Sequence, residues 1–163
     1  MPELPDVETF KNYLESTALH RRVEHVSVEA ERVLRDISPQ ALGRRLKGQR
    51  LEQTRRHGKY LFVRLDRGGW LLLHFGMTGY LAYYKLDGDA PKHMRAAFDL
   101  DSGYRLGFIN QRLLGKVGVV DDPAAFAERE GLGPDALDDR LDAARFRRIL
   151  ANRRGAIKAQ LMN

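Results

Sequence analysis

The chain opens Met1-Pro2-Glu3, and residues 2 and 3 combine an amine with a carboxylate. If Met1 is removed, Pro2 becomes a free secondary amine, which can attack an aldehyde carbon and give a positively charged iminium. Amine nucleophiles of this kind split a difficult reaction into two easier steps through a covalent intermediate. The Glu3 carboxylate is placed to move protons beside that amine. The opening residues therefore predict covalent amine chemistry.

The same stretch also predicts the start of a helix. Pro5 suits the first helical position, and acids in the first turn, here Asp6 and Glu8, face the positive end of the helix dipole. Apolar residues spaced three and four apart give this helix, from about 5 to 17, one apolar face: Val7, Phe10 and Leu14. A helix start explains Pro5, but it does not explain a second proline at position 2.

Two glycine-containing blocks lie near predicted strands. In His57-Gly58-Lys59-Tyr60 the glycine lets the backbone approach another group, and Lys59 adds a positive charge where a loop enters a strand. In His74-Phe75-Gly76-Met77-Thr78-Gly79 two glycines flank a methionine, which indicates a sharp loop presenting an apolar side chain. Such a wedge fills the hole left when a nucleotide is flipped out of a duplex. The alternatives are a solvated surface lysine and a methionine that only packs.

Together these blocks resemble the formamidopyrimidine-DNA glycosylase/endonuclease VIII family of base-excision repair enzymes. Members of that family begin Pro-Glu-Leu-Pro-(Asp/Glu)-Val-Glu after the initiator methionine, as this chain does. Their Arg-x-Gly-Lys-Tyr-Leu and His-x-Gly-Met-(Ser/Thr)-Gly stretches match residues 56–61 and 74–79 here. The match extends over the whole chain.

The resemblance implies a role for each matched residue. Pro2 is the nucleophile, and Glu3 is the general acid and base at the sugar ring. Lys59 contacts a DNA phosphate and assists catalysis. His74 lies near phosphate, and Met77 fills the void in the duplex.

The segment Asn110-Gln111-Arg112-Leu113-Leu114-Gly115 departs from the family pattern. Many members have Asp-Pro-Arg-Arg-Phe-Gly there, with the first arginine reaching the orphaned base and the phenylalanine intercalating. Arg112 matches that arginine, whereas Leu114 stands in place of the phenylalanine. Leucine can act as an apolar wedge but cannot stack as an aromatic ring does, which leaves the opposite-base preference open. The alternative for Leu113 and Leu114 is ordinary core packing.

His93 matches a family position where a Lys-His pair lies near DNA; an ordinary surface histidine is the alternative. The spacing of the histidines predicts no metal site, which would need several convergent ligands.

The composition fits a nucleic-acid partner. The 163 residues carry a formal net charge of +6 and a sequence pI of about 9.8, which suits a polyanion because cationic side chains release its counterions. The alternative is a soluble protein that is merely basic. There are no cysteines, hence no disulfides and no cysteine-ligated zinc in this chain. No apolar run approaches membrane-spanning length and the N-terminus lacks a secretory pattern, so a cytoplasmic protein without membrane contact is expected. The further expectations are association with the nucleoid and a monomeric state.

The apolar pattern predicts a β-rich domain followed by helices. Expected strands cover 23–28, 50–54, 60–65, 70–75, 81–85, 96–100, 104–109 and 116–120, with a hairpin at Asp66–Gly69. Helical patterns follow at 123–128, from 142, and at 156–162. The family's catalytic domain is a β-sandwich carrying the N-terminal helix. The expected fold class is therefore α+β, mostly β: a two-sheet antiparallel β-sandwich flanked by that helix.

The expected domain division is a catalytic domain over residues 1–135 and the start of a helix–two-turn–helix module over residues 136–163. The chain is expected to lack the family's C-terminal zinc finger, so no cofactor is expected in this chain and zinc only in that finger. The tail is basic, which suits a phosphate-facing surface as well as a solvated one. Its cations are Arg145, Arg147, Arg148, Arg153, Arg154 and Lys158.

The resemblance implies a glycosylase that excises oxidised bases from double-stranded DNA and then cuts the strand as an AP lyase. A truncated chain is expected to be impaired in this activity. The first alternative is a catalytically silent remnant that binds damaged DNA. The second is an unrelated RNA-binding β-domain, which leaves three motif matches unexplained. The sequence does not distinguish oxidised purines from oxidised pyrimidines.

Overall fold

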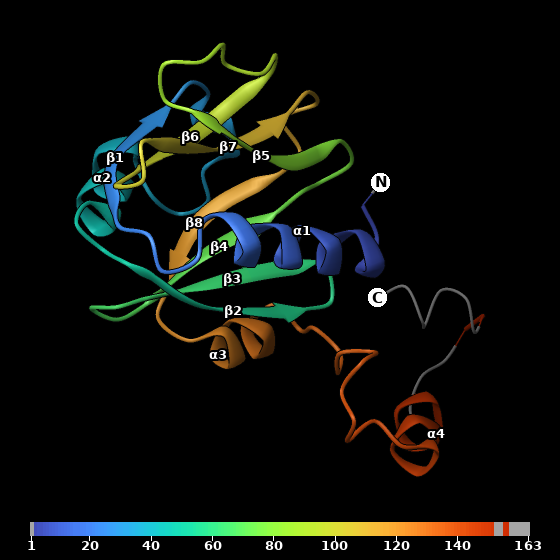
Figure 1. The fold of residues 1–163 in the computed structure, drawn as a ribbon. Helices are drawn as coiled ribbons and strands as arrows, with labels where there is room; N and C mark the ends of the chain where they lie inside the picture. Colours follow the sequence, from blue (N-terminus) through green and yellow to red (C-terminus); the bar gives the residue numbers. More distant parts are fainter. Residues whose placement is uncertain (1, 152–154, 157–163) are drawn as a thin grey trace. The chain divides into compact units, whose positions relative to one another are not determined.

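The computed structural model describes residues 2–151 and 155–156. In this part of the chain, eight strands form two antiparallel sheets (Figure 1). One sheet has the order β1 (Val23–Val28), β6 (Met94–Leu100), β7 (Tyr104–Asn110), β5 (Gly79–Lys85). The other has the order β2 (Leu51–His57), β3 (Tyr60–Leu65), β4 (Trp70–His74), β8 (Lys116–Val120). The predicted fold class, a mostly β protein with a two-sheet antiparallel sandwich, is confirmed.

Two helices cover the edges of the sheets. Helix α1 (Leu4–Thr17) contacts the edge strands β5 and β2 and lies between the two sheets, as Figure 1 shows. Helix α2 (Pro39–Leu46) contacts the other two edge strands, β1 and β8. A short 3-10 helix, η1 (Glu31–Val33), precedes α2. Edge strands present unpaired backbone groups, so covering them removes sites for unwanted strand pairing.

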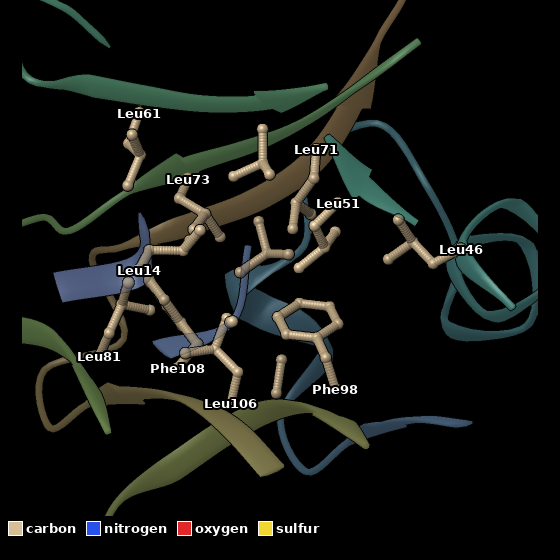
Figure 2. Close-up of a cluster of buried hydrophobic side chains, with 14 of the residues drawn as sticks. Leu14, Leu46, Leu51, Leu61, Leu71, Leu73, Leu81, Phe98, Leu106 and Phe108 are labelled. Carbon is tan, nitrogen blue, oxygen red and sulfur yellow. The ribbon is translucent and has the colours of Figure 1, made fainter. Parts of the chain in front are cut away.

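The core fills the space between the sheets (Figure 2). Leu14 from α1 lies among apolar side chains of both sheets, and all of them are almost fully buried. Those labelled in Figure 2 are Leu51, Leu61, Leu71, Leu73, Leu81, Phe98, Leu106 and Phe108, and Leu46 of α2 is labelled beside them. The helix spacing that predicted an apolar face is confirmed, since Val7 and Leu14 are buried and Phe10 packs against the core.

Both ends of β3 are hairpins. The predicted hairpin to β4 is confirmed, with Arg64 opposite Trp70. A second hairpin joins β2 to β3 through Gly58 and Lys59, and its glycine has a φ of +55°, which suits the first position of a two-residue turn. The expected strand at 50–54 was therefore too short at its end. The continuation of this strand through residues 55–57 was not predicted because these three residues are polar and show no apolar alternation.

The described residues fall into two units, one up to residue 123 and one from residue 124. The helices α3 (Pro123–Arg129) and α4 (Ala143–Ala151) match the predicted helical patterns. Helix α4 buries none of its side chains, and Phe146 is 39% exposed. The predicted helix at 156–162 and the cations at 153, 154 and 158 lie outside the described residues, apart from Ala156. The predicted domain boundary at 135 stays a prediction. Of the helices that the structure describes, none has the length and apolar character needed to cross a membrane.

Truncating the core should destabilise the fold strongly. Phe98 is 1% exposed, and Phe98→Ala is expected to lower the free energy of unfolding by about 3–5 kcal/mol because it removes buried area and leaves a cavity. Urea denaturation measures this loss. Leu86→Ala, at a site 42% exposed, is the control and should change stability by roughly 0.5 kcal/mol at most. Equal losses in the two variants would contradict the assigned core.

Candidate functional site

The register of the strands collects most predicted residues at one end of the sandwich. In one sheet Tyr60, His74 and Lys116 lie side by side across β3, β4 and β8. In the other, Gly79 on β5 lies opposite Asn110 on β7. We call this end of the sandwich the site end.

Two loops cross between the sheets at the site end. The β4–β5 loop (residues 75–78) leaves His74 and enters Gly79, and the β7–β8 loop (residues 111–115) leaves Asn110 and enters Lys116. The β2–β3 turn (residues 58 and 59) precedes Tyr60 at the same end. Predicted residues from three separate sequence blocks therefore share one surface.

Glu3 and Lys59 form an ion pair beside Pro2. The Lys59 Nζ lies 2.9 Å from Glu3 Oε1 and 2.8 Å from Oε2. Glu3 caps α1, and its backbone N–H donates a hydrogen bond to Asp6 Oδ2 at 2.7 Å. The Glu3 and Lys59 side chains are 53% and 38% exposed, so both remain accessible to a ligand. The structure thus joins two of the predicted catalytic residues, 56 positions apart, next to the third.

Arg56 ties the helix to the turn that carries Lys59. Its Nε donates to Glu8 Oε2 at 2.8 Å, and its Nη1 donates to the Gly58 carbonyl at 3.0 Å. The Arg56 side chain is only 6% exposed. This role was not predicted from the sequence, because the residues around Lys59 do not indicate that the Arg56 side chain is buried.

Glu8 is the shared acceptor of this connection. Burial acts to raise the pKa of Glu8, but hydrogen bonds from Arg56 and Lys11 outweigh it and hold that pKa below its usual range. Lys11 also lies 3.2 Å from Glu15 Oε1, and Glu15 in turn accepts a hydrogen bond from the Thr54 hydroxyl on β2. A row of polar contacts therefore fixes α1 along β2, which fixes where Pro2 and Glu3 emerge.

His74, predicted to lie near phosphate, ends β4 with its ring half-buried. Its ring centroid lies 4.8 Å from that of Tyr60. Burial lowers the pKa of His74, and the positive charges of Lys59 and Arg35 lower it further. A neutral imidazole is therefore the form that the folded chain favours near neutral pH.

The two loops at the site end touch backbone to backbone. A Cβ added to Gly76 would lie within 3.0 Å of the Leu114 and Gly115 backbone, and one added to Gly79 would collide with the Phe75 carbonyl. The Arg112 N–H donates to the Thr78 hydroxyl at 3.3 Å. Only glycine allows the contact between the loops at position 76 and the close approach of position 79 to the Phe75 carbonyl.

These touching loops expose the predicted DNA-binding side chains. Met77 is 38% exposed, Leu114 is 41% exposed, and Arg112 is also exposed. Leu113 packs against the core with a φ of +55°. The core-packing alternative therefore holds for Leu113 and is wrong for Leu114, which stands free of the interior.

His93 is joined to the same end through Asn110. Its carbonyl accepts from the Asn110 N–H at 3.0 Å, and its Nδ1 lies 3.3 Å from Arg95 Nη2. Arg95 Nε donates to the Asn110 carbonyl at 2.9 Å. Sequence analysis missed Asn110, which is fully buried although it is polar and was expected to begin a loop.

Comparison with known proteins identifies the lineage of this fold. The family model of the formamidopyrimidine-DNA glycosylase N-terminal domain matches residues 1–117. The chain belongs to this family. Among curated relatives, the formamidopyrimidine-DNA glycosylases of Stutzerimonas stutzeri and Thioalkalivibrio sulfidiphilus are 36% and 40% identical to it over its whole length. The chain spans about 60% of the length of each of these two relatives.

Solved structures of the family share the fold. The formamidopyrimidine-DNA glycosylase of Lactococcus lactis bound to DNA with an abasic site superposes with a TM-score of 0.90 at 23% identity, covering 99% of this chain and 62% of that one. The Lactococcus lactis protein in complex with DNA containing Fapy-dG gives a TM-score of 0.89 at 23% identity, covering 98% of this chain and 60% of that one. The predicted family is confirmed.

Removing Arg56 should loosen the family's N-terminal helix from the sheet. Arg56→Ala leaves Glu8 and the Gly58 carbonyl without this donor, which is expected to cost roughly 1–3 kcal/mol of stability. A double-mutant cycle with Glu8→Gln in urea denaturation should show a coupling energy well above zero. Arg64→Ala, an exposed arginine on β3, is the control and should be near neutral. Additive effects in the cycle would contradict the assigned role.

His74 should make stability depend on pH in a known direction. Because its pKa in the folded chain is below the ordinary 6.5, the unfolded chain binds the proton more readily. The contribution of neutral His74 to the free energy of unfolding is therefore complete above about pH 6.5. It is lost as the pH falls below that value. Unfolding free energies at pH 7.5 and 5.5 should differ less in His74→Gln than in wild type. His25→Gln, which removes an exposed histidine, serves as the control, and a His74 pKa at or above 6.5 by NMR would contradict the assignment.

Proposed function

We propose that this chain is the catalytic part of a base-excision repair DNA glycosylase with AP lyase activity. Its substrate is an oxidised base in double-stranded DNA. One observation carries the proposal: the Glu3–Lys59 ion pair lies next to Pro2, at the end of the sandwich that also exposes Met77 and Leu114.

The reaction follows from an amine at position 2. The Pro2 nitrogen bonds to C1′ of the damaged nucleotide, and the base leaves with the electrons of the glycosidic bond. The Glu3 carboxylate accepts the proton that the Pro2 nitrogen loses on bonding to C1′ and passes it to O4′ as the sugar C1′–O4′ bond opens, which leaves an iminium between Pro2 and C1′. The iminium withdraws electrons from C2′, so loss of a C2′ proton expels the 3′ phosphate. A second elimination expels the 5′ phosphate.

Lys59 supports these steps electrostatically. Its ammonium balances the Glu3 carboxylate and, being 38% exposed, can also contact a DNA phosphate. A cation already held in place needs no reorganisation when negative charge develops. Arg56 contributes indirectly, since it fixes the turn on which Lys59 stands.

Met77, Arg112 and Leu114 act on the duplex rather than on the sugar. The apolar side chains of Met77 and Leu114 fill the space vacated by the flipped nucleotide, and Arg112 reaches toward the orphaned base. In this proposal His74 lies near a DNA phosphate and His93 lies near the DNA. The Lactococcus lactis complex with DNA containing Fapy-dG supports an oxidised purine as the substrate.

A second candidate function is damaged-DNA binding without catalysis. If Met1 stays attached, the Pro2 nitrogen is an amide nitrogen and is not nucleophilic. The site end would still present its wedges and cations to DNA. The mass of the intact protein distinguishes a processed chain from one that keeps Met1.

Borohydride trapping on a duplex with an abasic site tests the proposal. Borohydride reduces the iminium, so the processed chain should form a covalent adduct, and Lys59→Met should slow its formation about 10²–10³-fold. Protein that keeps Met1 is the matched control and should give no adduct. Leu86→Ala should trap as wild type does.

The outcomes separate the candidates. Binding to abasic DNA without an adduct from the processed chain would favour the silent binder. An adduct only from a longer chain that includes the remaining family domains would support a loss of DNA affinity in this chain. No adduct from either chain would overturn the catalytic proposal.

A further inference from the structure

Asn110 uses its whole side chain to join the two exposed loops. Its Nδ2 donates to the Phe75 carbonyl at 2.9 Å, and its Oδ1 accepts from the Leu114 N–H at 3.1 Å. Phe75 begins the β4–β5 loop that carries Met77, and Leu114 is itself the other exposed apolar residue. One buried amide therefore bonds to both loops.

The surroundings of Asn110 leave this amide little freedom. Its backbone N–H and carbonyl are bonded to His93 and Arg95, and the residue is fully buried. A Cβ added to Gly79 or Gly115 would lie within 3.0 Å of Nδ2. Among the described residues, no buried side-chain nitrogen or oxygen lacks a hydrogen-bond partner. The side-chain amide of Asn110 is thus buried, has hydrogen-bond partners for its nitrogen and its oxygen, and is held in one orientation.

The two partners demand different chemistry from position 110. The Phe75 carbonyl needs a donor, whereas the Leu114 N–H needs an acceptor. An amide offers both on one plane, but a carboxylate of the same size only accepts. In this chain, whose loop departs from the Asp-Pro-Arg-Arg-Phe-Gly pattern of many family members, asparagine supplies the donor to the Phe75 carbonyl, which aspartate at the same place would not supply.

We propose that Asn110 is a positioning residue that fixes the distance between Met77 and Leu114, so that both side chains enter a damaged duplex as one rigid unit. The inference rests on the proposed function. Rigid wedges bind with less loss of conformational freedom than two independently moving loops. Undamaged duplex, which offers no void, makes no use of this rigidity.

The test is Asn110→Asp, which keeps size and acceptor but sets an oxygen against the Phe75 carbonyl. Affinity is measured for a duplex with a tetrahydrofuran abasic analogue and for the same duplex undamaged. We expect the variant to lose about tenfold in affinity for the abasic duplex and less than about twofold for the undamaged one. Val23→Ala is the control: it truncates a buried residue paired with Leu100, about 20 Å along β6 from Met94, and should leave the ratio of the two affinities unchanged.

Acidification provides a readout that general destabilisation would not give. In the Asn110→Asp variant, protonation of the new carboxylate restores a donor for the Phe75 carbonyl. The abasic-duplex affinity of this variant, divided by that of wild type, should therefore rise as the pH falls from 8 to 5.5. A ratio that stays low throughout, or an equal loss of preference in Val23→Ala, would overturn the inference.

Amide hydrogen exchange separates this inference from the proposed function, since it needs no DNA. Asn110→Asp should accelerate exchange at both Leu114 and Gly79, whose N–H donates to the same Phe75 carbonyl. Wild-type exchange at Gly79 would overturn the coupling. Faster exchange at both sites with an unchanged preference for abasic duplex would overturn the DNA role of Asn110 alone. A wild-type chain with no preference for abasic duplex would overturn the proposed function.

Discussion

The burial of one face of each sheet against the other is the constraint on which the rest of this structure depends. In a strand, successive side chains point to opposite faces, so a slip of one residue would move Leu71 and Leu73 out of the core. The apolar interior therefore fixes the register of every strand pair. Register in turn fixes which strand ends are neighbours, and so it brings His74, Lys116, Gly79 and Asn110 to one end.

The chemistry at that end depends on polar contacts that the core does not provide. Helix α1 delivers Pro2 and Glu3, and its position along β2 is fixed by Arg56, Glu8 and their neighbours rather than by apolar packing alone. The Arg56 side chain is only 6% exposed, and burying its charge would destabilise the fold unless the charge were paired. Arg56 is paired on both sides, with the helix and with the turn, so the desolvated charge acts as a connector.

The sequence predicted the elements whose apolar pattern is strong. The bounds of β3 and β8 match the expected strands, because most of their residues are apolar and several are β-branched or aromatic. Strand β2 was predicted too short, since its last residues, Arg55, Arg56 and His57, are polar although they pair with β3. Pattern reasoning detects burial through apolar side chains, and a buried arginine gives no such signal.

Site residues were predictable to a different extent. Amine chemistry at Pro2 follows from residue type, whereas the roles of Lys59 and Met77 came from the family resemblance. Asn110 was missed because a polar residue after a strand is ordinarily a loop residue. Its partners, Phe75 and Leu114, are close only once both sheets have formed. Long-range partnership of this kind is a property of the fold and cannot be deduced from local spacing.

The glycine contacts between the two loops divide this surface into a fixed part and a free part. Positions 76, 79 and 115 tolerate no side chain, because each added Cβ would meet backbone or Asn110. Met77 and Leu114, standing on that platform, are exposed and contribute little to the core. Exchanging either of them would alter the apolar surface exposed at the site end at little cost in folding free energy. If the proposed function holds, selectivity and stability are encoded by different residues of the same loops, so a lineage can change one while keeping the other.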